Sequence, residues 1–229
     1  MMQWTENEVK EWLTNVKPDV HLLIKSGVIS SQFDQESANY LLLACNLYQE
    51  WSWDEVIRFL DVLKATQKEF WKLPVLFQND IFTILRQAEI PKGYSLNQQV
   101  CGIFWSVGEF IRKSPNWYSL LSSEEFVQAI SQEIFYFGGH STLKVKSRRL
   151  WQYMCLFWPQ NFSFQPIDLV TLDVASYEFF KKSPWAQFFF SEDTHGKIKY
   201  YTRLCKRLNP SNPLMVAEKI ESYTINEFE

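Results

Sequence analysis

Hydrophobic residues recur at helical spacing along most of the chain. The clearest run places seven apolar residues on one side of a helix: Leu96, Val100, Ile103, Phe104, Val107, Phe110 and Ile111. Shorter runs with the same spacing lie at 41–48, 56–63, 126–134 and 143–157. Each run predicts a helix that buries one face against the rest of the protein.

Helix-start signals coincide with several of these runs. In a capping box, a hydroxyl accepts from the amide three residues on, and a Glu or Gln side chain accepts from the amide of the capping residue. The chain has four such pairs: Thr5 with Glu8, Ser52 with Glu55, Ser95 with Gln98, and Ser122 with Glu125. Further helices are predicted at 173–182, 193–208 and 213–222, the last with Pro213 at its first position.

Alternating strand patterns are scarce, and only 162–167 and 187–190 could form short extended segments. We therefore predict an all-α protein. Because proline- and serine-rich linkers are absent, the prediction is a single compact helical domain over residues 1–229, with two lobes around a cleft as the alternative. A seam between lobes would lie near 91–94 or 138–141.

The composition is that of a folded globular protein, with 46% hydrophobic and 21% charged residues, and this excludes a disordered chain. The net charge of −3 conceals an uneven distribution. Residues 140–207 contain eleven bases and five acids, a net +6, which leaves −9 on the remainder. This asymmetry predicts one basic face, unless the bases belong to several separate solvated helix faces.

The four cysteines are at least fifty residues apart, without a CxxC pair or a histidine at metal-ligand spacing. We expect them to be buried free thiols in a reducing compartment, and we predict no metal and no cofactor. No apolar run reaches the 18 residues of a membrane span, and residues 1–17 lack the pattern of a secretory signal. The expectation is a cytoplasmic protein without membrane contact.

Common catalytic signatures are absent, including the phosphate-binding loop, the dinucleotide-binding glycine pattern, the nucleophile elbow and the zinc-protease motif. One constellation remains, in the basic stretch. Gly138 and Gly139 precede a helix that carries four bases: Lys144, Lys146, Arg148 and Arg149. A second apolar stretch, residues 166–172, ends in Asp173 at the start of the next helix.

This order of elements resembles the helix-hairpin-helix superfamily of base-excision DNA glycosylases. It is similar to archaeal 8-oxoguanine glycosylases and to an uncharacterised bacterial branch of that superfamily. The resemblance implies a glycosylase and lyase that flips a damaged base out of double-stranded DNA. It implies nucleic-acid contacts by Gly138, Gly139, Arg148 and Arg149, and it alone suggests 8-oxoguanine as the base. The pair Gly138 and Gly139 lacks the proline and the spaced second glycine of the family's hairpin.

Elementary chemistry gives the same residues plausible roles. A carboxylate at a helix N-terminus, as Asp173 would be, can stabilise positive charge on a sugar carbon when a base departs. A lysine beside other cations can attack that carbon as a neutral amine. The order within the family motif favours Lys144 as this nucleophile. The helical wheel favours Lys146, which lies nearer the apolar stripe.

Two other interpretations fit the same residues. Asp173 can be a simple N-cap, and the lysines can extend along the surface without any active site. The chain can also be a noncatalytic helical adaptor, or a nucleic-acid-binding protein, that uses a basic face. In the adaptor interpretation, the partner is an acidic protein.

Overall fold

The structure, a computed structural model, describes most of the chain: residues 5–15, 21–48, 51–72, 78–90, 94–119, 123–134, 145–165 and 168–221. These residues form twelve α-helices and two 3-10 helices, and none of them is in a strand, which confirms the predicted all-α fold. The chain divides into two units. One unit is residues 20–164, and the other joins residues 1–19 to 165–229. The divisions thus fall at 19–20 and 164–165. Of the expected seams, 138–141 and all of 91–94 except Tyr94 lie outside the described residues.

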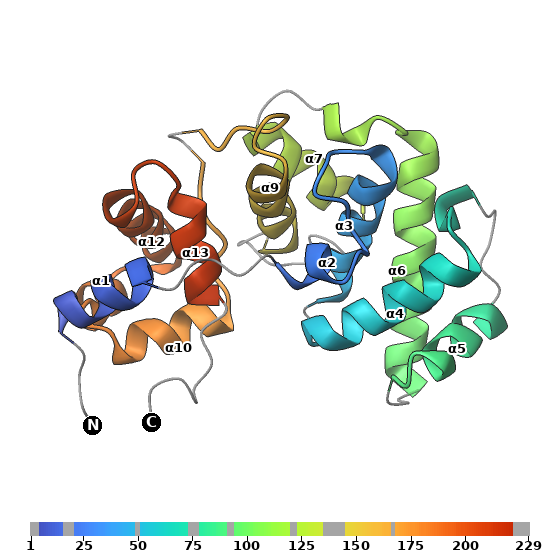
Figure 1. Cartoon of the computed structure of the whole chain (residues 1–229), viewed down its shortest axis with the longest axis horizontal. Coiled ribbons are helices and arrows are strands. Elements are labelled where there is room, and N and C mark those ends of the chain that lie inside the picture. Colours follow the sequence, from blue (N-terminus) through green and yellow to red (C-terminus); the bar gives the residue numbers. More distant parts are fainter. Residues whose placement is uncertain are drawn as a thin grey trace. The chain divides into compact units, whose positions relative to one another are not determined.

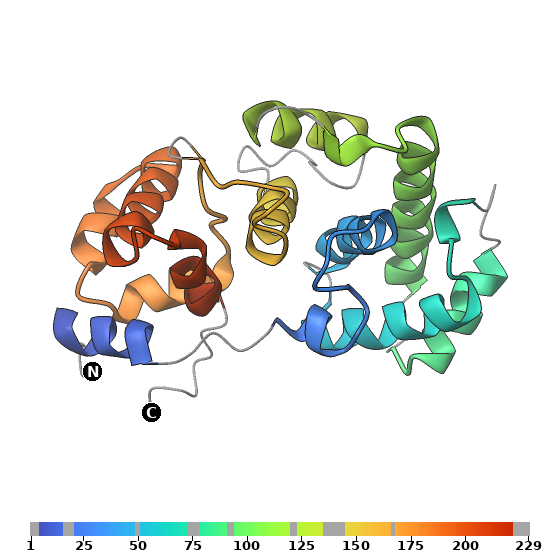
Figure 2. The ribbon, with the colours of Figure 1, turned by 45° about the horizontal axis from the view of Figure 1, so that its top comes forward.

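The middle unit contains most of the helices. In chain order they are α2 (Leu22–Lys25), α3 (Gln35–Leu47), α4 (Trp53–Thr66), η1 (Phe70–Lys72), α5 (Gln78–Gln87), α6 (Tyr94–Lys113), η2 (Trp117–Ser119), α7 (Ser123–Glu133) and α9 (Val145–Phe157). Helix α3 is central and packs against α4, α6 and α9 (Figures 1 and 2). Its residues from Ser37 to Leu47 are all buried, because neighbouring helices cover it on more than one side.

Two of the predicted helices have the expected buried face. On α4, the buried residues are the predicted Val56, Phe59, Leu60 and Leu63. On α6, six of the seven predicted apolar residues are buried: Val100, Ile103, Phe104, Val107, Phe110 and Ile111. The side chain of the seventh, Leu96, lies outside the described residues. Helical periodicity therefore identified the core-facing sides of both helices.

Two of the four capping boxes are present. At α4, Ser52 N donates to Glu55 Oε2 over 2.8 Å, and Glu55 N donates to Ser52 Oγ over 3.4 Å. Thr5 and Glu8 make the same reciprocal bonds at the start of α1 (Glu6–Asn15). The other two boxes, at Ser95 and at Ser122, involve side chains outside the described residues.

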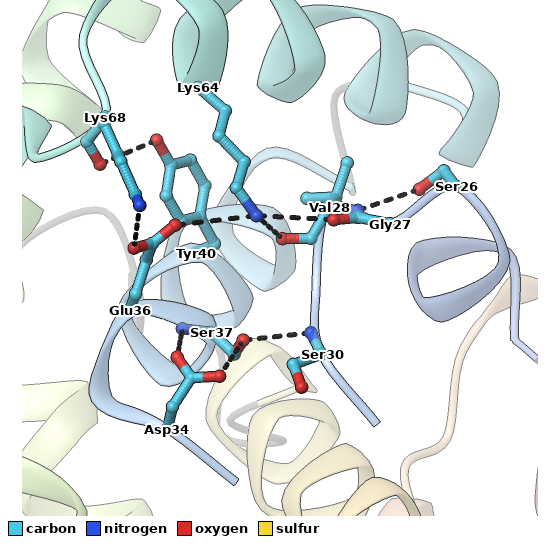
Figure 3. Close-up of polar contacts among 10 residues, drawn as sticks. All are labelled: Ser26, Gly27, Val28, Ser30, Asp34, Glu36, Ser37, Tyr40, Lys64 and Lys68. Carbon is cyan, nitrogen blue, oxygen red and sulfur yellow. Dashed lines mark hydrogen bonds and ion pairs between the residues drawn. The ribbon is translucent and has the colours of Figure 1, made fainter. Parts of the chain in front are cut away.

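The start of α3 is held by a polar network that also joins it to α4 (Figure 3). Asp34 caps the helix, since its Oδ1 accepts from Ser37 N over 2.7 Å. Ser37 Oγ donates to Asp34 Oδ2 over 2.9 Å and accepts from Ser30 N over 2.9 Å. Lys64 of α4 donates to the carbonyl of Val28 over 3.0 Å and pairs with Glu36 at 3.5 Å. These bonds fix the connection that leads into α3.

The second unit joins the two ends of the sequence. Its helices are α1, α10 (Val174–Lys182), α11 (Ala186–Ser191), α12 (Thr194–Leu208) and α13 (Pro213–Glu221). Helix α13 packs against α12 and α10, and α1 lies beside α10 (Figures 1 and 2). The Trp12 ring of α1 stacks on Phe179 of α10 at 5.9 Å between centroids. The starts and ends of α10, α12 and α13 agree with the predicted ranges to within one residue.

One local prediction was wrong. Residues 187–190 form part of helix α11 and not an extended segment. The physical reason is that a short apolar run fits a strand or a buried helical turn equally well, and packing decides between them. Phe189 is fully buried and stacks on Phe180 at 4.0 Å, while Phe188 stays 62% exposed.

The four cysteines form no disulfide, and three of them have the expected burial. Cys45, Cys155 and Cys205 are buried, and Cys101 is half-buried. None of the helices in the described part of the chain combines the length and the apolar character that a bilayer crossing requires.

Candidate functional site

Helix α9 carries an unusual set of buried polar residues. Five of them are less than a tenth exposed: Lys146, Ser147, Arg148, Arg149 and Gln152. Arg148 and Arg149, expected on a solvated basic face, are 9% and 1% exposed. This corrects the expected exposure of these two arginines. The cause is that α9 packs against both α3 and α7, so its polar side is enclosed as well as its apolar side.

The lysine of this helix points at the end of α3. Lys146 Nζ donates to Asn46 Oδ1 over 3.1 Å, and Asn46 is fully buried. The carbonyl end of a helix carries partial negative charge, so the last turn of α3 is a favourable place for a lysine amine. Within the described residues, Asn46 Nδ2 and Ser147 Oγ are buried without a hydrogen-bond partner. Two polar atoms near the lysine therefore remain able to form a hydrogen bond.

An aromatic stack adjoins this polar cluster. The Arg149 guanidinium lies over the Tyr48 ring at 4.5 Å from its centroid. Tyr48 stacks on Trp53 at 4.0 Å with an interplanar angle of 15°. Both rings are half-buried. Because Lys146 and Arg149 are three residues apart on α9, the amine and the cation on the stack lie on the same side of the helix.

His21 completes the aromatic group. Its imidazole packs against Trp53 at 5.0 Å, Tyr153 at 4.8 Å and Phe157 at 5.1 Å between centroids. Its Nδ1 accepts from Leu23 N over 3.2 Å, which caps α2. Burial of the imidazole lowers the pKa of His21 from its ordinary 6.5 to about 4. The ring is therefore uncharged at neutral pH. Its role is structural, because a group with this pKa is a poor proton donor near pH 7.

Asp173 occupies the N-cap of α10, as one of the sequence interpretations stated. Its Oδ1 accepts from Ser176 N over 2.9 Å and from Ser176 Oγ over 3.0 Å. The residue is half-buried, and the adjacent Val174 is 77% exposed. The carboxylate is thus fixed in direction by two hydrogen bonds from Ser176.

The phenol of Tyr201 lies behind this cap. Burial raises the pKa of Tyr201 well above its usual range, and the neighbouring groups of Cys205, Glu221 and Asp173 raise it further. Tyr201 OH donates to the carbonyl of Ala217 over 3.2 Å. A neutral, hydrogen-bonded tyrosine in the core thus supports the start of α10.

The predicted site residues are distributed over both units. Lys146, Arg148 and Arg149 belong to the middle unit, and Asp173 belongs to the unit built from the chain ends. Gly138, Gly139 and Lys144 lie outside the described residues. Sequence reasoning missed Asn46, whose signal is a single amide within the apolar run 41–47. It also missed the stack of Tyr48 and Trp53, for which the sequence has no local signal.

Within the described part of the chain, no group of three or more His, Cys, Asp or Glu residues could hold a metal ion. Comparisons with models of protein families, with curated proteins and with solved structures each found no match.

Proposed function

We propose that this protein binds double-stranded DNA and excises a damaged base as a glycosylase and lyase, with a lysine of the basic stretch as the nucleophile. The observation that supports it best is the position of Lys146. Its amine lies in buried, polar surroundings, 3.1 Å from an amide oxygen, on a helix that also carries two buried arginines. A lysine nucleophile works when it is oriented and shielded from water.

The reaction assigns one task to each group. The lysine nitrogen forms a bond to the anomeric carbon of the sugar and gives up a proton. The bond from that carbon to the base breaks, and the base leaves with the electron pair and takes up a proton. Opening of the sugar ring then leaves a Schiff base between lysine and sugar. Asp173 stabilises the positive charge that develops on the sugar in this sequence.

The aromatic stack supports the same proposal. An enzyme that acts on a base within a duplex must extrude it, and extruded bases stack on aromatic rings. The half-buried Trp53, which stacks on Tyr48 beside Arg149, offers such a ring. Which damaged base is bound depends on the pocket, and the suggestion of 8-oxoguanine comes from the family resemblance alone.

Borohydride trapping tests this function. Duplexes that carry a panel of lesions are incubated with the parent protein and with the variants Lys144→Ala, Lys146→Ala, Lys146→Gln and Asp173→Asn. We expect the parent to be trapped covalently on DNA. Trapping should be lost in the variants of one of the two lysines, and excision should be lost in Asp173→Asn. Lys146→Gln keeps a donor for Asn46, so it separates loss of the amine from loss of packing. Lys113→Ala, at a lysine whose side chain is 70% exposed, is the control that should trap normally.

Single variants that each abolish excision, while circular dichroism shows a folded protein, would support the catalytic proposal. A folded parent that neither excises nor traps any lesion of the panel would exclude the catalytic function.

A further inference from the structure

Three exposed bases form a row on α12. Lys199, Arg203 and Arg207 follow one another at intervals of four residues, so they lie on the same side of the helix. All three are exposed, whereas Tyr201 and Cys205 on the opposite side are fully buried. At about 1.5 Å of rise per residue, the row is roughly 12 Å long. We call these three residues the α12 row.

The charges that face this row are few. Arg207 Nη2 lies 3.7 Å from Glu6 Oε1, a surface pair whose glutamate also pairs with Lys10 at 2.9 Å. Such exposed pairs are weak and are screened by salt. Among the residues that the structure describes, Lys199 and Arg203 have no ion-pair partner. The row is therefore available to an external anion.

Two acids stand at the start of α12, before the row begins. Asp193 Oδ1 accepts from Gly196 N over 2.6 Å as the N-cap. Its neighbour Glu192 is exposed, and the Glu192 carbonyl accepts from Lys197 Nζ. Asp193 is thus engaged with its own helix, and the three bases of the α12 row follow in the later turns.

We propose that the α12 row binds the phosphate backbone of nucleic acid. This proposal rests on the DNA binding in the proposed function and not on the excision of a base. Duplex DNA carries one negative charge per about 3.4 Å along each strand, so a straight row of cations can contact successive phosphates. The planar guanidinium groups of Arg203 and Arg207 suit phosphate oxygens in particular.

The α12 row also replaces the earlier candidates for backbone contact. Arg148 and Arg149 were expected to face DNA but are buried, whereas the three bases of the α12 row, in the same basic stretch, are exposed. An acidic protein would need carboxylates that match the spacing of the row, whereas a polyanion presents charge at every step. This difference favours nucleic acid as the partner. Contacts of this kind position the protein and do not read sequence.

Salt-dependent binding of a fluorescent duplex tests the proposal. The variant carries Lys199→Gln, Arg203→Gln and Arg207→Gln together. The control carries Lys68→Gln, Lys72→Gln and Lys113→Gln, which removes the same charge from exposed lysines of the other unit. Each phosphate contact contributes about 0.9 to the slope of log affinity against log salt, so the row variant should lose about 2 to 3 of that slope. The control should keep the parental slope.

The outcomes separate this proposal from the catalytic one. If the row variant binds DNA with the parental slope, or if the control loses as much slope as the row variant, the α12 row is not the contact surface. Borohydride trapping at saturating DNA, measured on the same proteins, then reports the catalytic function independently. If binding depends on the row but no lesion is trapped, the α12 row remains the DNA-contact surface and the catalytic function is excluded. A parent that binds no duplex, but retains one protein stoichiometrically through the row, would overturn the proposal in favour of an acidic protein partner.

Discussion

At the scale of single residues, the environment of a side chain decides its chemistry more than its type does. Arg149 and Arg203 are both arginines of the same basic stretch, yet one is 1% exposed over a tyrosine ring and the other faces solvent. His21 illustrates the same point, because three aromatic rings enclose its imidazole. The enclosure of His21 has a measurable consequence for stability.

His21 should make the protein sensitive to acid. Its pKa is about 4 in the folded state and close to 6.5 in the unfolded chain. The folded state therefore binds this proton less readily, so the stabilisation is complete above pH 6.5 and is lost as the pH falls toward 4. From pH 7 to pH 5 the loss from this group is about 2 kcal/mol.

Urea unfolding at the two pH values checks this expectation. The comparison is between the parent and His21→Asn, which retains an acceptor for the cap of α2 but does not titrate. The parent should lose about 2 kcal/mol more than the variant on acidification. Equal losses in the two proteins would contradict the assignment.

The buried contact between Lys146 and Asn46 should be energetically coupled. A hydrogen bond between buried polar groups contributes about 1 to 3 kcal/mol when one partner is removed and the other remains enclosed. A double-mutant cycle with Asn46→Ala and Lys146→Met isolates this term in the free energy of unfolding. We expect each single variant to be destabilised and the double variant to be less destabilised than their sum. Additive effects would mean that the two side chains do not depend on each other.

At the scale of elements, local signals fixed where helices begin and tertiary contacts fixed what they bury. Ser52 with Glu55 and Asp173 with Ser176 are contacts over three residues, so both are legible in the sequence. Helix α11 has only six residues, and an isolated helix of that length is not stable in water. Its existence depends on the contact that Phe189 makes with Phe180.

Replacement of Phe189 should therefore be far more harmful than replacement of its neighbour. Phe189→Ala removes a fully buried ring and should cost about 3 to 5 kcal/mol. Phe188→Ala, at a position that is 62% exposed, is the matched control and should change stability by less than about 0.5 kcal/mol. Thermal or chemical unfolding of the two variants measures the difference. Similar losses for both would show that α11 is not anchored in this way.

At the scale of the whole molecule, each unit has its own hydrophobic core and its own charged residues. The unit of the chain ends depends on contacts between distant segments, such as the stacking of Trp12 on Phe179 and the position of Lys219 Nζ 5.1 Å from the Trp12 centroid. The basic stretch 140–207 is divided between the two units. Its net charge of +6 therefore does not describe one surface.

The sequence by itself determined the all-α class, most helix ranges and the cap at Asp173, because these depend on neighbours within about one turn. It also placed Val56, Phe59 and Leu63 in the core through their periodicity. Only the tertiary structure decided that Lys146 meets Asn46, a hundred residues away in sequence, and that Arg149 lies on Tyr48. The physical reason is that charge and periodicity are counted along the chain, whereas burial is set by which helices pack together. For the same reason, only the structure identified Lys199, Arg203 and Arg207 as the exposed row.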